Sequence, residues 1–535
     1  MSTILRTENE CLINGEWVPG DEEFAVISPV TGEKIGSFRA ATPEQVTVAV
    51  TAAWQAFPAY AASRWTARER LLRRLRDLLL VHQDELADIM IDEVGKTRVD
   101  TITADLMPAI ETIDYYARRT PAVLASKPLG HFKPPLWGKW GRIDRVPVGV
   151  VGVISPWNFP VSLAMAAIIP ALAAGNTVVW KPSEQATLTG LAMARIFAEA
   201  GFPPGTFNVV TGGPATGAAL TSSNIETLVF IGGTAAGQKV LQAMAARGKH
   251  AILELGGNDA MIVLEDADLD QAAAGAAWGA CANAGQICSG VKRVIVVGRD
   301  RAEALAAKIA HVAAGLKMGS GHDPQVAIGP LISAQARERI HAFVVDATAR
   351  RARVLAGGRI PEGPGFFYPP TVLAGVSPDS RLWQEEAFGP LVPVVAVKTE
   401  AEAIAAANDT PFGLSASVWT RDPERGMALA RRIRAGTVMI NDHSSTWGDI
   451  RCPWGGFGLS GRGRIHGDEA LLELTQPQVV VADRQGPAKM WWYPYSSGKA
   501  RFFRAAVDLL YGGLARKLRA AASLVRGAST GGKGG

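Results

Sequence analysis

The sequence predicts an α/β protein with a doubly wound, mostly parallel sheet, followed by a second unit of the same kind. From about residue 148, short β-branched runs alternate with alanine-rich stretches. We expect strands in VGVVGVIS, NTVVWK, FNVVT, ETLVFIG and AILELG, and helices near 161–174, 187–200 and 235–246. Strands that alternate with helices of about 10–15 residues indicate parallel βαβ units, whose sheet is covered on both faces.

The pattern starts again after Glu254. Further strands are expected in AMIVLEDAD, KRVIVVG, LVPVVAVK, SASVWT and GTVMIN, with helices near 268–284 and 302–314. Two consecutive α/β units indicate two lobes that face each other across a cleft. Residues 40–125 carry apolar residues at helical spacing, which is typical of a helical scaffold.

Composition excludes several classes of protein. A chain of 535 residues with 48% hydrophobic and 20% charged residues is typical of a soluble globular protein of two or three lobes. The four scattered cysteines form no metal-binding or disulfide pattern, which favours a reducing compartment. No signal peptide is recognisable, and the longest apolar stretch, 161–175, is shorter than the ~20 residues of a membrane span. A cytoplasmic protein is therefore expected.

The basic character of the chain comes from its C-terminal tail. Residues 499–535 hold eight Lys or Arg and one acidic residue, Asp508, a net +7. The whole chain is at +5, so the other 498 residues sum to −2. The body therefore shows no sign of nucleic-acid binding.

Two loops after expected strands carry groups suited to a nucleotide. ETLVFIG runs into Gly232, Gly233 and Thr234, and a glycine turn before a helix offers backbone N–H groups to a phosphate. Lys181 and Glu184 in TVVWKPSE follow another strand, where a carboxylate can bind a ribose hydroxyl. A plain turn and a solvated loop are the alternatives.

Three further side chains are candidates for chemistry. Asn158 in SPWNFP can donate its amide to an oxyanion, although Asn-x-Pro is more often a turn. Glu254 lies between two leucines in LELGGND, where burial would raise its pKa and make it a general base near neutral pH. Cys288 lies between glycines in NAGQICSG, and a buried structural cysteine is the alternative there.

In this order and spacing, SPWNFP, WKPSE, FIGGTAAG, ELGGND, GQICSG and EEAFGP resemble the aldehyde dehydrogenase superfamily, from about Leu12 to about Gln478. The resemblance implies that the Cys288 thiolate adds to the aldehyde, that a hydride passes to a nicotinamide, and that the thioester is hydrolysed. Asn158 and the backbone N–H of Cys288 would hold the oxyanion. Glu254 would activate the thiol, the water, or both.

The resemblance also implies a cofactor site and a domain plan. Residues 1–124 and 148–255 would form the NAD-binding domain, 256–460 the catalytic domain, and 125–147 with 473–485 an oligomerisation arm of a homodimer or homotetramer. NAD is expected because Glu184 would repel a 2′-phosphate, with NADP left open, and no metal is expected. The expected cofactor-binding residues are Lys181, Glu184, Gly232, Thr234, Glu386, Phe388 and Trp157.

The chain departs from the family pattern beside the expected substrate site. In PWGGFGLSGRGRIHG, Trp454 stands where many relatives have phenylalanine, Gly458 replaces a lysine and Ile465 a glutamate. Trp454, Trp447, Ile287 and Trp157 indicate an apolar funnel for a medium- or long-chain aliphatic or an aromatic aldehyde.

Other substrates and reactions remain alternatives. Ala166 aligns with an arginine of succinate semialdehyde dehydrogenases, although Arg451 could reach the site from its loop. A CoA-acylating aldehyde dehydrogenase is disfavoured because such enzymes generally lack a glutamate at the position of Glu254. A catalytically silent binding or scaffold protein would not need Cys288. A cysteine hydrolase would need a histidine beside the cysteine, and these motifs contain none.

The C-terminal extension, 489–535, is expected to be a basic amphipathic helix that Gly512 and Gly513 weaken or kink. Its apolar face would consist of Phe503, Val507, Leu510, Leu514, Leu518, Ala521 and Val525, preceded by an aromatic cluster. Peripheral contact of 491–526 with the inner surface of a membrane is one interpretation, and packing within the protein or on a partner subunit is the other. A similar extension in fatty aldehyde dehydrogenases favours a long-chain substrate.

Overall fold

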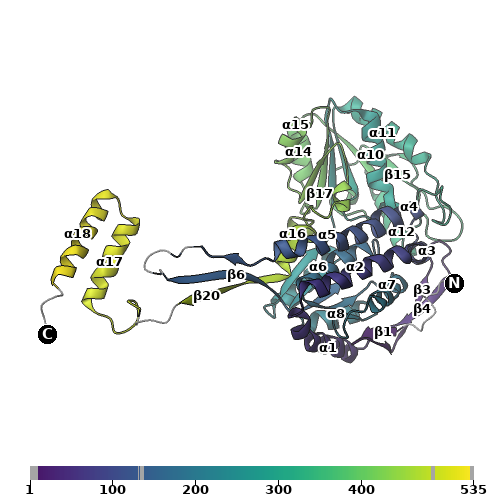
Figure 1. The fold of residues 1–535 in the computed structure, drawn as a ribbon. Helices are drawn as coiled ribbons and strands as arrows, with labels where there is room; N and C mark the ends of the chain where they lie inside the picture. Colours follow the sequence, from purple (N-terminus) through teal and green to yellow (C-terminus); the bar gives the residue numbers. More distant parts are fainter. Residues whose placement is uncertain (1–9, 131, 133–135, 137, 484–488, 531–535) are drawn as a thin grey trace. The chain divides into compact units, whose positions relative to one another are not determined.

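The computed structural model describes residues 10–130, 132, 136, 138–483 and 489–530 (Figure 1). Residues 1–9, 131, 133–135, 137, 484–488 and 531–535, which include parts of the expected arm and extension, lie outside the described residues. The chain divides into two units, Met1–Ser126 with Asp144–Gln478 and Lys127–Ile143 with Val479–Gly535.

The first unit contains an eight-stranded sheet that holds the expected strands of residues 148–255. Its order is β19 (Gly461–Arg462), β11 (His250–Glu254), β10 (Thr227–Ile231), β7 (Val150–Ile154), β8 (Thr177–Lys181), β9 (Phe207–Val209), β1 (Glu10–Ile13) and β2 (Glu16–Pro19). The strands from β11 to β9 are parallel. The short strands β1, β2 and β19 were not predicted and join antiparallel at the two edges.

A second, seven-stranded sheet contains the expected strands of the later segment. Its order is β14 (Arg353–Ala356), β15 (Thr371–Ala374), β16 (Leu391–Val397), β13 (Val291–Val297), β12 (Asp259–Val263), β17 (Ser415–Trp419) and β18 (Thr437–Ile440), and all pairs except β14 with β15 are parallel. Helices α14 and α15 lie on one side of this sheet and α10 and α11 on the other (Figure 1). The doubly wound architecture is confirmed.

Helices cover both sheets. Those around the first sheet are α1 (Pro43–Ala61), α2 (Trp65–Val81), α3 (Gln83–Val94), α4 (Arg98–Asp100), the π-helix η1 (Thr101–Leu106), α5 (Met107–Val123), α6 (Ser162–Ala174), α7 (Thr187–Ala200), α8 (Pro214–Ser222), α9 (Thr234–Ala245) and α16 (Gly467–Glu473). Those of the second lobe are α10 (Leu269–Cys281), η2 (Ala282–Gly285), α11 (Arg299–Ala314), α12 (Ala334–Ala349), α13 (Arg381–Gln384), α14 (Glu400–Asn408), α15 (Pro423–Ala430), η3 (Ser445–Gly448) and η4 (Gly458–Ser460). A further two-stranded sheet pairs β3 (Glu23–Ile27) with β4 (Lys34–Arg39).

Helix α6 is the central core helix of the first lobe. Each of its residues is buried, and it ends where Gly175 adopts a left-handed conformation. The continuous apolar run from Ser162 to Ala174 therefore reflects burial on all sides of one helix. Ala166, at the position where the sequence comparison placed a substrate arginine in relatives, is fully buried in this core.

The second unit contains the extended arm and the C-terminal extension. Strands β20 (Thr475–Asp483), β6 (Lys139–Pro147) and β5 (Lys127–Pro128) form a three-stranded sheet. The extension forms two helices, α17 (Ser497–Tyr511) and α18 (Leu514–Thr530), in place of the single helix expected. They separate at Gly512 and Gly513, since two glycines in succession weaken a helix. The two helices pack beside each other as a hairpin (Figure 1).

Candidate active site

The order of strands in the first sheet brings the candidate loops together. The chain moves outward from β7 to β8 and β9 and returns on the other side through β10 and β11. Loops that leave neighbouring strands β7 and β10 in opposite directions open a crevice at the carboxyl ends of the strands, where open α/β sheets bind ligands. SPWNFP follows β7, Lys181 ends β8, Gly232 follows β10 and Glu254 ends β11.

The largest of three cavities at this edge, the Lys181 cavity, has a volume of about 740 Å³ and is lined by Lys181, Glu184, Trp157, Gly232 and Gly233. Lys181 Nζ donates hydrogen bonds to the carbonyl oxygens of Pro182 and Gly212 at 2.8 and 2.7 Å. It lies 3.7 Å from Glu184, whose side chain is 40% exposed. Burial lowers the pKa of Lys181 to about 8. An amine beside a reachable carboxylate suits the hydroxyl groups of a ribose.

The glycine turn after β10 leads directly into α9. Gly233 is the N-cap of this helix, and a Cβ atom at that position would meet nothing within 4 Å. Thr234 begins the helix, and its buried Oγ1 has no hydrogen-bond partner in the described structure. An open helix N-terminus with an unused hydroxyl fits a pyrophosphate. The residues at this edge thus fit a dinucleotide.

Cys288 lies in the loop between η2 and β13, where two smaller cavities meet. It lines both of them and is half-buried. Burial and the charges of Glu254 and Glu386 raise the pKa of its thiol, while a backbone hydrogen bond from Ser289 opposes the rise. The thiol is therefore protonated at neutral pH in this state, and a base has to remove its proton for it to act as a nucleophile.

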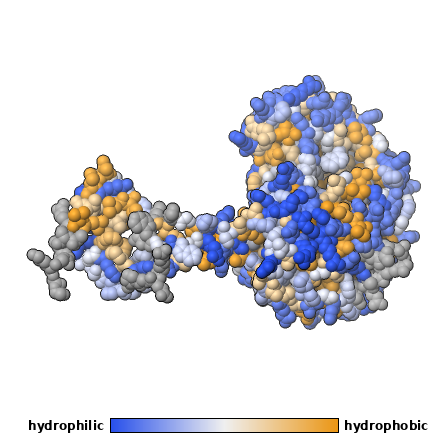
Figure 2. All heavy atoms as spheres, in the orientation of Figure 1, coloured by the Kyte–Doolittle hydropathy of each residue, from blue (hydrophilic) through white to orange (hydrophobic). Residues whose placement is uncertain are grey.

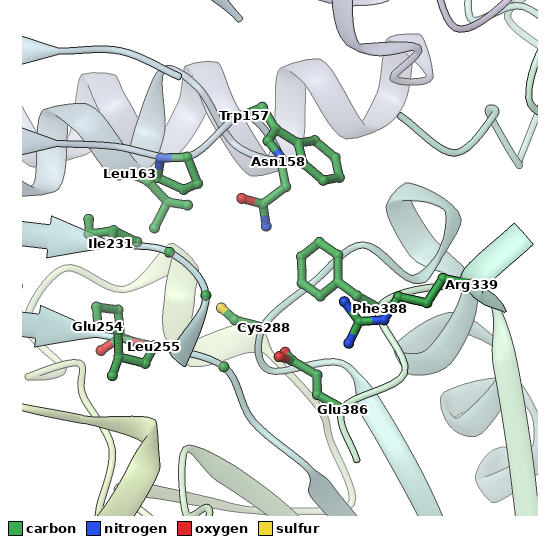
Figure 3. Close-up of a pocket in the computed structure, with 14 residues that line it drawn as sticks. Trp157, Asn158, Leu163, Ile231, Glu254, Leu255, Cys288, Arg339, Glu386 and Phe388 are labelled. Atoms are coloured by element: carbon green, nitrogen blue, oxygen red, sulfur yellow. The ribbon is translucent and has the colours of Figure 1, made fainter. Parts of the chain in front are cut away.

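The Asn158 side chain points into the cavity in front of Cys288 (Figure 3). Its Nδ2 donates to the carbonyl oxygen of Gln286 at 3.0 Å, which uses one of its two N–H groups. Its backbone carbonyl accepts hydrogen bonds from Lys96 Nζ at 2.8 Å and from Asn283 Nδ2 at 3.1 Å. The amide is thus held on both sides, with one N–H left to bind a negatively charged oxygen.

Lys96, which the sequence analysis did not single out, anchors this arrangement. The side chain is buried, lies 3.1 Å from Asp105 Oδ2 and has its Nζ 4.0 Å from the centre of the Phe159 ring. It also donates to Asn283 Oδ1 at 3.2 Å. A lysine in a short connection between two helices has no sequence signal that distinguishes it from a surface residue, because its partners Asp105, Asn158 and Asn283 are identified only by the folded structure.

Glu254 ends β11 and is buried. Its Oε1 accepts a hydrogen bond from Trp454 Nε1 at 2.9 Å. Burial raises its pKa to about 8, although the bond from Trp454 and the charge of Arg464 act in the opposite direction. A carboxyl group with this pKa gains and loses its proton near neutral pH, which is what general base catalysis requires.

The second cavity, the Glu386 cavity, has a volume of about 280 Å³ and is shown in Figure 3. Glu386 Oε1 accepts a hydrogen bond from the Gly257 backbone at 3.2 Å. A Cβ atom on Gly256 would lie 2.1 Å from Glu386 Oε2, so only glycine leaves this carboxylate in place. Phe388 packs edge-on against Trp157, with ring centres 5.8 Å apart. The sequence-predicted residues Trp157, Asn158, Gly232, Glu254, Cys288, Glu386 and Phe388 therefore share one cavity.

Arg339, on α12, also lines the Glu386 cavity and was not predicted. Burial raises the pKa of Glu386, and the charges of Lys292 and Arg339 act against that rise. Arg339 is exposed and lies in an ordinary charged helix, which explains why no motif marks it.

The third cavity, the Trp447 cavity, has a volume of about 200 Å³ on the other side of Cys288. The predicted residues Trp447, Trp454 and Ile287 line it together with Phe159, Leu163 and Trp278. Asp100 is its one carboxylate, and Asn283 N donates to Asp100 Oδ2 at 3.2 Å. The cavity is thus mainly apolar, with four aromatic rings and a single acidic group among the described residues that line it.

The structure corrects one suggestion about this region and explains one departure from the family pattern. Arg451 does not line the Trp447 cavity: its side chain is 79% exposed and pairs with Asp449. Gly458, which replaces the lysine of many relatives, has a φ of +60°, and a Cβ there would lie 2.3 Å from the Pro411 carbonyl oxygen. The turn itself therefore requires glycine in this chain.

The described residues contain no group of three or more His, Cys, Asp or Glu side chains that could hold a metal ion. Nor is any helix in the described part of the chain long and apolar enough to cross a membrane.

Comparisons with known proteins agree with this site. The profile of the aldehyde dehydrogenase family matches residues 17–480. A betaine aldehyde dehydrogenase of Cereibacter sphaeroides is 38% identical over 456 residues, 85% of this chain and 92% of that protein. A 4,4'-diapolycopene aldehyde oxidase of Methylomonas is 35% identical over 490 residues, 91% of each chain. The solved NAD+ complex of an aldehyde dehydrogenase from Bacillus cereus, 35% identical, matches with a TM-score of 0.86 over 90% of this chain and 98% of that chain. The chain therefore belongs to the aldehyde dehydrogenase family and is an NAD(P)-dependent oxidoreductase that acts on an aldehyde.

Proposed function

We propose that this enzyme oxidises an apolar aldehyde, medium- or long-chain aliphatic or aromatic, to its carboxylic acid through a thioester on Cys288, with NAD as the preferred cofactor. The observation that carries the proposal is the position of Cys288 between a cavity of polar groups and a cavity of aromatic rings. One side suits the cofactor and the catalytic groups, and the other suits a hydrophobic substrate.

The residues around Cys288 provide each step of the reaction. Glu254 takes the thiol proton, a bond forms between Sγ and the carbonyl carbon, and the oxygen becomes negatively charged. The free N–H of Asn158 and the backbone N–H of Cys288 stabilise that oxygen. A bound NAD would supply the acceptor for the hydride that leaves the carbon, which would turn the adduct into a thioester. Glu254 releases the thiol proton to solvent and then takes a proton from a water molecule, whose oxygen bonds to the thioester carbon while the C–S bond breaks and the sulfur leaves as the thiolate.

Hydrolysis by water is preferred over transfer to CoA because Glu254 lines the cavity with a pKa of about 8. Product analysis tests this step. The free acid should form at the same rate with and without CoA, and a CoA thioester as the main product would refute hydrolysis.

Glu184 supports NAD over NADP. Its carboxylate is 3.7 Å from Lys181 in the Lys181 cavity, where it can accept hydrogen bonds from ribose hydroxyls and would repel a 2′-phosphate. Glu184→Gln should reduce the ratio of kcat/KM for NAD to that for NADP by about tenfold. An unchanged ratio would show that this side chain does not select the cofactor. Cys288→Ala should abolish aldehyde oxidation with either cofactor.

The Trp447 cavity supports an apolar substrate, because rings and aliphatic groups form most of its lining. Formation of NADH, followed by absorbance, should give kcat/KM values that rise with aldehyde chain length, with Cys288→Ala as the blank. A preference for succinate semialdehyde would refute the apolar class, since no basic side chain is among the described residues that line the cavity.

An aldehyde with a cationic end is the second candidate. Asp100 lies among the aromatic rings of the cavity, and a carboxylate with aromatic faces is the environment that quaternary ammonium groups favour. A relative that is 38% identical is named for betaine aldehyde. Betaine aldehyde therefore belongs in the substrate series, and Asp100→Asn should weaken its use selectively if it is the better substrate.

We also propose a homodimer or homotetramer assembled through the arm, residues 125–147 and 473–485. The described strands of the arm expose apolar side chains at Trp140, Val479, Val480 and Val481. Such a surface is typical of an interface. Sedimentation velocity should give two or four subunits, and Val480→Asp should lower that number.

Finally, we propose that the C-terminal hairpin binds the anionic inner surface of a membrane. Ala505 and Ala520 are buried in the hairpin, whereas the expected apolar face is exposed at Val507, Leu514 and Leu518 (Figure 2). The exposed cations of the two helices are Arg501, Arg504, Arg516, Lys517 and Arg519. Apolar groups beside cations suit an anionic bilayer surface.

Vesicle co-sedimentation tests this contact. The full chain should bind vesicles that contain phosphatidylserine, bind less in high salt, and bind phosphatidylcholine vesicles weakly. Leu514→Ser with Leu518→Ser should abolish binding while aldehyde oxidation continues. Equal binding by this variant would refute the membrane proposal, and a change in its subunit number would favour an intersubunit role.

A further inference from the structure

We infer that Trp454 is a positioning residue that holds Glu254 through its indole N–H, so that the carboxylate keeps one oxygen free for the thiol or water. The inference rests on the proposed role of Glu254 as the base. It concerns a position where this chain differs from the many relatives that carry phenylalanine, a side chain without a hydrogen-bond donor.

The hydrogen bond is short and protected from water. Trp454 Nε1 lies 2.9 Å from Glu254 Oε1, and the two residues are 1% and 2% exposed. A buried donor next to a buried carboxylate gives a stronger interaction than the same pair in water. Because the bond uses only Oε1, Oε2 can act on the substrate side.

The indole is itself fixed in place. The backbone of Trp454 exchanges two hydrogen bonds with Ile465, at 2.6 and 2.9 Å, and its ring packs edge-on against Trp447 with centres 5.4 Å apart. The same segment pairs with the strand of Glu254 through Gly461. The donor and the acceptor are therefore attached to one rigid piece of the sheet.

An indole nitrogen cannot accept a proton, so Trp454 cannot relay one. Its effect is electrostatic, because a hydrogen bond to the charged form of a carboxyl group favours that form. The other titratable or charged groups that act on Glu254 are Arg464, which also favours the carboxylate, and Asp259, which opposes it. Cys288 is coupled to Glu254 by charge. Loss of the indole N–H leaves only Arg464 to favour the base.

Trp454→Phe tests the inference, because it deletes the donor and keeps an aromatic ring. The rise of kcat with pH should move upward by roughly one unit, which lowers kcat at neutral pH by about tenfold and restores it at high pH. KM for the aldehyde should change by less than about threefold.

Trp447→Phe is the matched control. Trp447 lines the same cavity and contacts the ring of Trp454, but its Nε1 has no hydrogen-bond partner in the described structure. Any effect of losing an indole in this cavity appears in both variants, whereas the shift along the pH axis should appear only in Trp454→Phe.

Glu254→Gln separates the two proposals. If this variant is inactive and the Trp454→Phe profile matches the wild type, the inference about Trp454 is wrong while the role of Glu254 stands. If Glu254→Gln keeps wild-type turnover and pH dependence, the proposed base is wrong. Should Trp454→Phe fail to fold, benzothienylalanine at position 454 replaces only the N–H by sulfur and should give the same shift.

Discussion

The Glu386 cavity and the Trp447 cavity meet at Cys288, yet they differ in chemistry and construction. The Glu386 cavity contains the buried Glu254 and the half-buried Glu386, an amide and an arginine, and the ends of strands β7, β10 and β11 border it. The Trp447 cavity is mainly apolar and is bordered by η1, α10 and η3. Glu254 thus lies at the end of a sheet strand and Asn158 in the loop that follows one, whereas the groups suited to recognition lie on helices and loops.

This difference predicts how substitutions should divide. Changes in the Glu386 cavity should lower kcat or cofactor binding for all aldehydes. Changes in the Trp447 cavity, other than at Cys288 and Trp454, should alter the ranking of aldehydes and leave the chemistry intact.

The largest effect should come from Cys288, which belongs to both cavities. Cys288→Ala should reduce kcat by roughly a thousandfold or more with every aldehyde, because no covalent adduct can form. Calorimetry should show NAD binding within about threefold of wild type. Cys452→Ala, which removes another half-buried thiol, should keep wild-type turnover. Substantial turnover by Cys288→Ala would show that Cys288 is not the nucleophile on which both cavities act.

Asn158→Ala should reduce kcat by about a hundredfold, since one preorganised donor to an oxyanion contributes about 3 kcal/mol. KM for the aldehyde should change little, because the bond strengthens only when the oxygen becomes charged. If KM rose and kcat stayed constant, Asn158 would be a ground-state binding residue.

The pH dependence of kcat should be set by Glu254 in the Glu386 cavity and should be the same for every aldehyde. Glu254 acts as a base only when deprotonated, and its pKa is raised to about 8, so kcat should rise roughly tenfold between pH 7 and pH 9. The measurement is kcat across this range with two aldehydes of different length. A midpoint that depends on the aldehyde would contradict the separation of the two cavities.

Gly256→Ala should raise KM for NAD by roughly tenfold with a small change in KM for the aldehyde. The added Cβ would lie 2.1 Å from Glu386 Oε2 and force that carboxylate out of position. Initial-rate measurements with varied NAD and varied aldehyde distinguish the two effects. Equal changes in both KM values would indicate a general distortion.

The smallest effect should come from Trp447→Ala. It should lower kcat/KM for long-chain aldehydes by about fivefold and leave acetaldehyde within twofold, because only long chains reach the lost apolar surface. A uniform loss of kcat/KM for short and long aldehydes would show that the Trp447 cavity does not discriminate between aldehydes by chain length.

Much of both sheets could be predicted because the central parallel strands, such as β7, β8, β10, β12 and β13, are buried along their whole length and have β-branched, mostly apolar sequences. NTVVWK forms β8, and the helix expected near 187–200 is α7 with the same bounds. The edge strands β1, β2 and β19 were missed because short antiparallel strands carry no such run. The extension was helical as expected, but the two glycines divide it into a hairpin.

The residues of the candidate site that belong to a short motif were predicted. Those that only the packing of the chain brings to the site were missed. Cys288, Glu254 and Asn158 stand in short patterns of small and apolar residues, and they line one cavity as expected. Lys96 lies in the short connection between α3 and α4, and Arg339 lies on the charged helix α12. Nothing in their local sequence could identify them as neighbours of the site.

The sequence by itself determined which residue types follow each strand, because parallel strands end at one edge of a sheet and their loops must meet there. Only the tertiary structure decided which groups touch. Trp454, expected to face the substrate, also donates a hydrogen bond to Glu254, 200 residues away along the chain. That contact depends on β19 joining β11 at the edge of the sheet, and two residues of antiparallel pairing have no pattern in the sequence.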